Sequence, residues 1–163
     1  MKIIGIGPSM VSTGWGVISV SGNRMMHLGH GTILPSMGLP LNRRLLFIYE
    51  GILDVLEEFA PEEAAIEEPF IKNNNATLMF QLGQIRAAAM LASAYGELLV
   101  AEYAAKVVKD TLFETRGDKN YPVAFMVRQL LTAPVITSAN AADALAVAIT
   151  HANHVEDTRT KNR

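Results

Sequence analysis

The order in which strand-forming and helix-forming segments follow one another constrains this chain more than any other feature. Apolar runs at 2–6, 14–20 and 24–34 are separated by Gly-Pro and Ser-Gly-Asn breaks, which predicts three antiparallel strands in succession. Apolar residues then recur at helical spacing over 41–59, and Pro61 stops that pattern. The first third of the chain therefore predicts a meander of strands packed by an amphipathic helix.

The remaining two thirds of the sequence adds two short strands between helices. Strands are predicted at 64–67 and 98–103 and helices at 76–95 and 104–113. A further helix should begin between Asp118 and Pro122 and end before Pro134, and the last should run from about Ser138 into a polar end near His154. No repeat or low-complexity linker interrupts this order. The fold class expected is α/β, a mixed five-stranded sheet flanked by helices, whose chemistry gathers at strand ends.

Length and composition limit the number of domains and the class of protein. The 163 residues suit one domain, taken as 1–155 with a frayed polar tail at 156–163. Half of the residues are apolar and none is cysteine, which excludes a disulfide scaffold and a thiolate zinc site. The apolar start is too short for a signal peptide or a membrane span, so a cytoplasmic protein is expected.

The charge of the whole chain gives no attraction for nucleic acid, because the formal net charge is -2. A local basic patch is possible where cations gather in one stretch: Lys106, Lys109, Arg116 and Lys119. Acidic residues lie among them, so an ordinary mixed-charge surface is the alternative reading.

Acidic and amide side chains occur at two places in the sequence that could contribute to a functional site. Glu67 and Glu68 close an apolar strand, and because neighbouring strand residues face opposite sides, only one of them should point inward. Asn140 and Asp143 lie three residues apart at the start of the last helix and so share a face. The alternative for Asp143 is a charge that complements the helix N-terminus. His151 and His154 are expected at the surface.

Together with the glycine-rich first hairpin, these segments resemble the RuvC family of Holliday-junction resolvases. The family opens with Gly-Ile-Asp-Pro-Gly and Thr-Gly-aromatic-Gly, carries an Ile-Glu strand end before a Phe, and finishes with an Asp-Ala-Ala-Asp-Ala-Leu-like helix. The counterparts in this sequence are Gly5–Ser9, Thr13–Gly16, Ile66–Glu67 with Phe70, and Asn140–Ala148. The match runs in order along nearly the whole chain.

The resemblance implies a fold, a reaction and partners. The fold is RNase H-like, and the reaction is metal-dependent, symmetrical cleavage of four-way junction DNA in recombination and repair. Two Mg²⁺ ions held by an acidic cluster would activate water and stabilise the leaving oxygen. The resemblance also implies a homodimer, and the RuvA and RuvB branch-migration proteins as partners. The helix over 76–95 is the candidate dimer interface, and a place in the core of its own chain is an equally natural alternative.

The sequence departs from the family at two acidic positions. Gly7 stands where the family has its first-strand Asp, and Asn140 replaces the first acid of the last motif. Only Glu67 and Asp143 remain as matched acids, and they are the predicted metal ligands. Because Mg²⁺ depends on anionic oxygen ligands, weak or single-metal occupancy is expected.

The resemblance places cations and an aromatic residue on the DNA. Lys109 and Lys119 match positions that meet phosphates near the site, and Phe70 matches a loop aromatic near the junction centre. Without the resemblance, Phe70 would be expected to fill the core. The full set of candidate DNA-binding residues is Phe70, Lys72, Lys106, Lys109, Arg116 and Lys119.

Two hypotheses follow. The chain is a RuvC-type endonuclease that keeps some activity, or a junction-binding relative without catalysis. An RNase H-like enzyme acting on RNA and a relative of the actin-like ATPases are weaker alternatives, the second because such ATPases need two larger domains.

Overall fold

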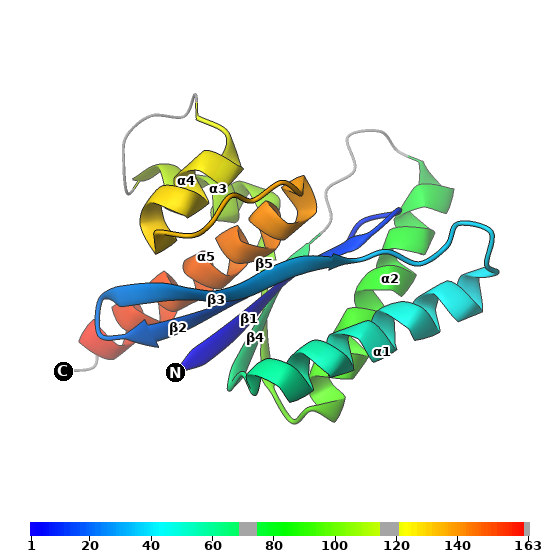
Figure 1. Ribbon diagram of the computed structural model, residues 1–163, viewed down its shortest axis with the longest axis horizontal. Helices are drawn as coiled ribbons and strands as arrows, with labels where there is room; N and C mark the ends of the chain where they lie inside the picture. Colours follow the sequence, from blue (N-terminus) through cyan, green and yellow to red (C-terminus); the bar gives the residue numbers. More distant parts are fainter. Residues whose placement is uncertain (69–74, 115–120, 162–163) are drawn as a thin grey trace.

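The computed structural model describes residues 1–68, 75–114 and 121–161 and has one mixed sheet with helices on both faces (Figure 1). The sheet order is β3-β2-β1-β4-β5, in which β1, β2 and β3 run antiparallel while β4 and β5 run parallel to β1. The strands are β1 Lys2–Gly7, β2 Thr13–Ser21, β3 Arg24–Ile33, β4 Glu63–Glu68 and β5 Leu99–Ala104. The five strands and the mixed direction predicted from the sequence are confirmed.

The helices divide between the two faces of the sheet. One face is covered by α1 and α2 and the other by α3, α4 and α5, each with its own cluster of buried apolar residues (Figure 1). The helices are α1 Leu41–Phe59, α2 Ala76–Tyr95, α3 Ala105–Glu114, α4 Val123–Leu131 and α5 Ala139–Lys161. The inner strands β1 and β4 are therefore covered by a buried apolar layer on each face of the sheet.

Helix α5 lies unusually close to the sheet. A Cβ atom at Gly5 would overlap the backbone of Ala144, and one at Gly14 would overlap the backbone of Asn140. Ala141, Ala144 and their alanine neighbours on α5 are fully buried in this contact. Small residues on both sides thus bring the first turns of α5 against the ends of β1 and β2.

The last helix is longer than the sequence pattern predicts. The polar residues after His154 indicate an end there, whereas α5 continues to Lys161. No glycine or proline follows His154, so nothing in the sequence stops the helical hydrogen bonding. Within the described residues, no helix is long and apolar enough to cross a membrane.

One expectation about the surface is wrong. His151 is buried, with 7% of its surface exposed, because its side chain extends from α5 toward β4 and β5. Its Nε2 is 2.7 Å from Oε2 of Glu63, and its Nδ1 is 2.8 Å from the hydroxyl of Tyr103. The ring is a structural link between α5 and the two parallel strands.

Candidate functional site

The residues singled out in the sequence meet at one end of the central strands. Gly7 ends β1, Glu67 lies near the end of β4, and Asn140 and Asp143 lie in the first turns of α5. Together they line a cavity of about 530 Å³. The lining residues are Gly7, Pro8, Ser9, Met10, Glu67, Leu82, Ala105, Lys109, Val123, Asn140 and Asp143.

The two neighbouring glutamates of β4 point in different directions. Glu67 is half-buried and lines the cavity, whereas Glu68 is exposed and does not. The strand alternation that predicts a single inward-facing acid is therefore confirmed. Asn140 and Asp143 also line the cavity together, as their spacing on one helix predicts.

The electrostatics of the cavity are those of two partly buried acids facing one cation. Burial first, and then the charge of Asp143, raise the pKa of Glu67 to about 7, while the charge of Lys109 opposes both effects. Burial also raises the pKa of Asp143, again against Lys109. In the described residues, Lys109 is thus the cation that partly offsets an unfavourable concentration of negative charge.

The glycine at the end of β1 leaves room for a side chain. Ile6 pairs with Ile66, so Gly7 and Glu67 follow at corresponding places on adjacent parallel strands. A Cβ atom at Gly7 would lie 3.5 Å from the carbonyl oxygen of Asn140, which is ordinary van der Waals distance. Unlike Gly5 and Gly14, this glycine is not required by the packing of α5.

Asn140 is engaged with the loop between β1 and β2. Its Nδ2 donates to Oγ of Ser12 over 2.5 Å and to Oγ of Ser9 over 3.2 Å. Ser9 in turn donates to the carbonyl oxygen of Ser12 over 2.6 Å. The amide therefore ties the loop to α5 and uses its NH₂ group as a donor, which a carboxylate in the same place cannot do.

A second contact holds the same loop from the opposite side. Nη2 of Arg44, on α1, donates to the carbonyl oxygen of Met10 over 2.6 Å. The loop that lines the cavity is thus fixed by one residue of α5 and one of α1. Sequence reasoning missed Ser9, Ser12 and Arg44 as supports of the site, because short polar side chains in a loop give no signal of which distant residue they contact.

The donors around this cavity do not fit two divalent ions. Throughout residues 1–68, 75–114 and 121–161, no three Asp, Glu, His or Cys side chains are grouped so that they could hold a metal ion. Glu67 and Asp143 are the acids present, and the NH₂ of Asn140 already donates to two serines. Hard cations require several anionic or carbonyl oxygens, and this set provides few of them.

The candidate cations differ in their surroundings. Lys109 lines the cavity, as the resemblance implies, whereas Lys106 is exposed and its Nζ lies 2.6 Å from Oδ2 of Asp110. That hydrogen bond raises the pKa of Lys106, and the negative charge of Asp110 partly neutralises the lysine. The other candidate DNA-binding residues lie outside the described residues: Phe70, Lys72, Arg116 and Lys119.

The fold agrees with solved structures of junction-resolving enzymes. Thermus thermophilus RuvC in complex with Holliday junction substrate superposes with a TM-score of 0.83 at 30% identity, covering 96% of both chains. The yeast mitochondrial Holliday junction resolvase Ydc2 superposes at 0.68 with 9% identity, a likeness of fold alone. The sheet order and the placement of the helices define an RNase H-like fold of the resolvase class.

The sequence comparisons narrow the class to one family. The family described as Crossover junction endodeoxyribonuclease RuvC matches residues 3–151. The RuvC protein of Caulobacter vibrioides is 46% identical over 93% of this chain and 89% of its own length. That of Rhodopseudomonas palustris is 48% identical over 94% and 88%. The chain belongs to the RuvC family and is a Holliday junction resolvase of the RuvC type.

Proposed function

We propose that this chain binds four-way DNA junctions and that its own set of acids supports cleavage poorly. The observation that carries the proposal is the composition of the cavity, where Glu67, Asp143 and Lys109 surround an end of β1 that bears no side chain. Family membership supports the junction as the substrate. The missing side chain at Gly7 supports the loss of activity.

The small number of acidic side chains in the cavity supports weak catalysis. Glu67 and Asp143 are the two acids that line the cavity, so few anionic oxygens are available there to a divalent cation. Asn140 contributes no charge, and its NH₂ group already donates to Ser9 and Ser12. Glu67 and Asp143 are thus proposed as residual metal ligands, with Mg²⁺ weakly held or present as one ion.

Junction binding is proposed to depend on residues other than Gly7 and Asn140, the two positions at which the chain departs from the family. The Thermus relative was solved with Holliday junction substrate. In this chain, Lys109 in the cavity is proposed to meet a phosphate of the bound strand. Phe70, Lys72, Lys106, Arg116 and Lys119 are proposed as further DNA contacts on the ground of the family resemblance.

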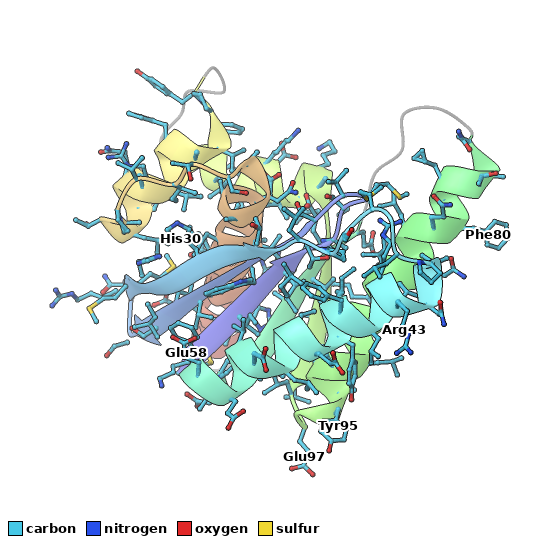
Figure 2. The ribbon with its side chains drawn as sticks, turned by 45° about the vertical axis from the view of Figure 1, so that its right-hand side comes forward. His30, Arg43, Glu58, Phe80, Tyr95 and Glu97 are labelled. Carbon is cyan, nitrogen blue, oxygen red and sulfur yellow. The ribbon has the colours of Figure 1, made fainter. Side chains whose placement is uncertain are left out.

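A homodimer is proposed through α2. Phe80 is 76% exposed and points away from α2 into solvent (Figure 2), with Met79 and Leu91 also exposed on this helix. An apolar groove of about 550 Å³ follows the same surface. It is lined by Ala76, Met79, Phe80, Gly83, Gln84 and Ala87. Large exposed apolar side chains in a row are typical of a surface that another protein covers.

The dimer proposal has a direct test. Phe80→Glu places a charge in the apolar groove and should shift the chain from dimer to monomer in sedimentation velocity. Glu97→Gln, an exposed change at the far end of the α2 region, is the matched control and should leave the dimer intact (Figure 2). A monomeric wild-type chain at micromolar concentration contradicts the proposal.

The cellular setting follows from the substrate. A junction-binding member of this family is proposed to act in the cytoplasm on recombining DNA, alongside the RuvA and RuvB branch-migration proteins. Family membership is the support for these partners.

Binding is tested without metal, so that cleavage plays no part. The labelled four-way junction and a linear duplex of the same sequence are titrated with protein in EDTA, at several salt concentrations. The wild-type chain should bind the junction more tightly than the duplex. Lys109→Ala should weaken junction binding and reduce the salt dependence. Arg24→Ala should not, because Arg24 begins β3 at the end of the β2–β3 hairpin that lies away from the cavity. Equal affinity for junction and duplex contradicts the proposal.

A further inference from the structure

Two histidine side chains on the edge strand β3, called the histidine pair below, lie against each other. Nε2 of His27 is 2.8 Å from Nδ1 of His30, and the two ring centroids are 5.0 Å apart. Both side chains are half-buried, and β3 forms one edge of the sheet, where its only neighbouring strand is β2. Two imidazole nitrogens therefore face each other at a place that solvent reaches.

A β-bulge turns the two rings to the same face of the strand. Residues three apart on a regular strand point to opposite faces of the sheet. The register of β2 with β3 shifts between Val17 and Ile18, so Leu28 is an extra residue on β3. This extra residue brings His30 to the face on which His27 lies.

The bulge itself packs on the opposite side of the sheet. Leu28 contacts the apolar cluster shared with α1 and α2, and a Cβ atom at Gly29 would overlap the ring of Phe59 on α1. Because the next residue points the other way, His30 lies on the face that carries α4 and α5, as Figure 2 shows. The packing that fixes the bulge is thus independent of the two histidine rings.

The ordinary role of such a contact is a hydrogen bond that braces the bulge, in which one ring donates and the other accepts. The surroundings of the rings also suit a second role. Burial lowers the pKa of both histidines, and the charge of His30 lowers that of His27 further. Both rings are therefore neutral at pH 7, and neutral imidazole is the form that binds a transition metal.

The separation of the two nitrogens matches the spacing of two ligands on one metal ion. Imidazole nitrogens bind such ions at about 2.0–2.1 Å, so two of them at a right angle to each other are about 2.9 Å apart. If the donor ring carries its proton on its other nitrogen instead, both facing nitrogens have a free lone pair and no proton is released. Small rotations about χ2 then turn both lone pairs toward a common ion.

We propose that His27 and His30 form a chelating site for a late first-row transition-metal dication, of the class of Ni²⁺, Cu²⁺ and Zn²⁺, with water completing the coordination. Imidazole suits these ions, whereas Mg²⁺ takes oxygen ligands. The site is separate from the cavity, whose lining includes no residue of β3. Bound metal would join the strand on both sides of the bulge and stabilise this edge of the sheet.

Retention on immobilised Ni²⁺-nitrilotriacetate tests the site in the untagged chain, because this chelate leaves two adjacent coordination positions open. The wild type should be retained until imidazole elutes it, whereas the double variant His27→Gln with His30→Gln should pass through. His154→Gln is the matched control and should be retained, since His154 is exposed on α5, far along the chain from the pair. Passage of the wild type through the column, or equal retention of the double variant, overturns the proposal.

Stability with and without metal separates chelation from a hydrogen bond that only braces the bulge. Glutamine keeps a donor and an acceptor at both positions, so the double variant retains the means to brace the strand. The melting temperature of the wild type should rise by roughly 5 °C when free Ni²⁺ exceeds its Kd about a hundredfold, and should not respond to Mg²⁺. An equal rise with Ni²⁺ in the double variant contradicts the site.

A titration of the wild type with Zn²⁺ gives a readout that needs no substitution. In ¹⁵N-labelled protein, the NMR resonances of the imidazole nitrogens report which atoms bind the ion. Nε2 of His27 and Nδ1 of His30 should shift together and saturate at one ion per chain, while the nitrogens of His151 and His154 stay unchanged. Shifts confined to His151 or His154, or no shift at all, overturn the proposal.

Discussion

The amide of Asn140 donates to the hydroxyl of Ser12 over 2.5 Å, joining the start of α5 to the loop after β1. The two residues are far apart in the sequence, and this contact sets one wall of the cavity. It also gives the neutral residue at position 140 a role of its own. An amide that holds a loop is not simply a weakened carboxylate.

Exchanging this amide for an acid should cost stability when no metal is present. Asn140→Asp removes the donors to Ser9 and Ser12 and adds a third carboxylate beside Glu67 and Asp143. The expected loss is about 1–2 kcal/mol in the free energy of unfolding, measured by urea denaturation in EDTA. Ser9→Ala, which removes one hydroxyl partner, should cost less. A stabilised Asn140→Asp variant contradicts the hydrogen-bonding role.

Position 7 should accept a side chain that position 14 rejects. A Cβ atom at Gly7 meets its nearest backbone atom at 3.5 Å, whereas one at Gly14 overlaps the backbone of Asn140. Gly7→Ala should therefore change the free energy of unfolding by less than about 1 kcal/mol, and Gly14→Ala should cost about 3 kcal/mol or prevent folding. Thermal unfolding of both variants measures the difference. Equal destabilisation would show that Gly7 is retained for packing.

The buried acid of β4 should make the protein less stable as pH rises. The pKa of Glu67 is about 7 in the folded chain against 4.5 as its ordinary value, so the folded state binds more protons between these pH values. The stability contributed by the neutral acid is fully present below about pH 4.5 and is lost as the pH rises through about 7. Glu67→Gln should therefore be more stable than the wild type above pH 7, by about 1–3 kcal/mol.

The control for this prediction is the neighbouring glutamate. Glu68 is exposed on the other side of β4, and Glu68→Gln should leave the dependence of unfolding on pH unchanged. Urea denaturation at pH 5, 6, 7 and 8 compares the three proteins. If Glu67→Gln and the wild type keep the same difference at every pH, the acid is ionised throughout.

Much of the fold and the core of the site could be predicted from the sequence. The succession of strands and helices along the chain follows from turn residues and apolar spacing, because these are local signals. Strand alternation predicts that one of Glu67 and Glu68 points inward, and the family resemblance selects Glu67. Helical spacing groups Asn140 with Asp143. The family resemblance brought these segments together at one end of the sheet, where the structure has them.

The supports of the site could not be predicted, since they depend on contacts between distant segments. Nothing local to Arg44 indicates that it reaches the carbonyl oxygen of Met10. His151 follows a run of alanines near a polar end, which suggests exposure, yet the two parallel strands bury it. The length of α5 was underestimated for a similar reason, because polarity indicates solvent but does not by itself end a helix.

The buried histidine should matter for stability away from the cavity. His151 bonds both Glu63 and Tyr103, so His151→Ala leaves two half-buried polar groups without a partner. The expected cost is about 2–3 kcal/mol in the free energy of unfolding. Tyr103→Phe removes one hydroxyl only and should cost about 1 kcal/mol. Thermal unfolding measures both variants. A small effect of His151→Ala would show that the hydrogen bonds of His151 to Glu63 and Tyr103 contribute little to stability.

We propose above all that the chain recognises junctions but cleaves them poorly, because residue 7 is a glycine and provides no negative charge to the site. The most direct test measures strand nicking of a labelled four-way junction, with Mg²⁺ and with EDTA, by the wild type, Gly7→Asp and Gly7→Asn. The two variants add side chains of similar size, and only the first adds a negative charge. The account predicts slow nicking by the wild type and by Gly7→Asn, and symmetrical nicking by Gly7→Asp that is at least about tenfold faster and depends on Mg²⁺. Efficient Mg²⁺-dependent nicking by the wild type, unchanged by Gly7→Asp, would contradict it.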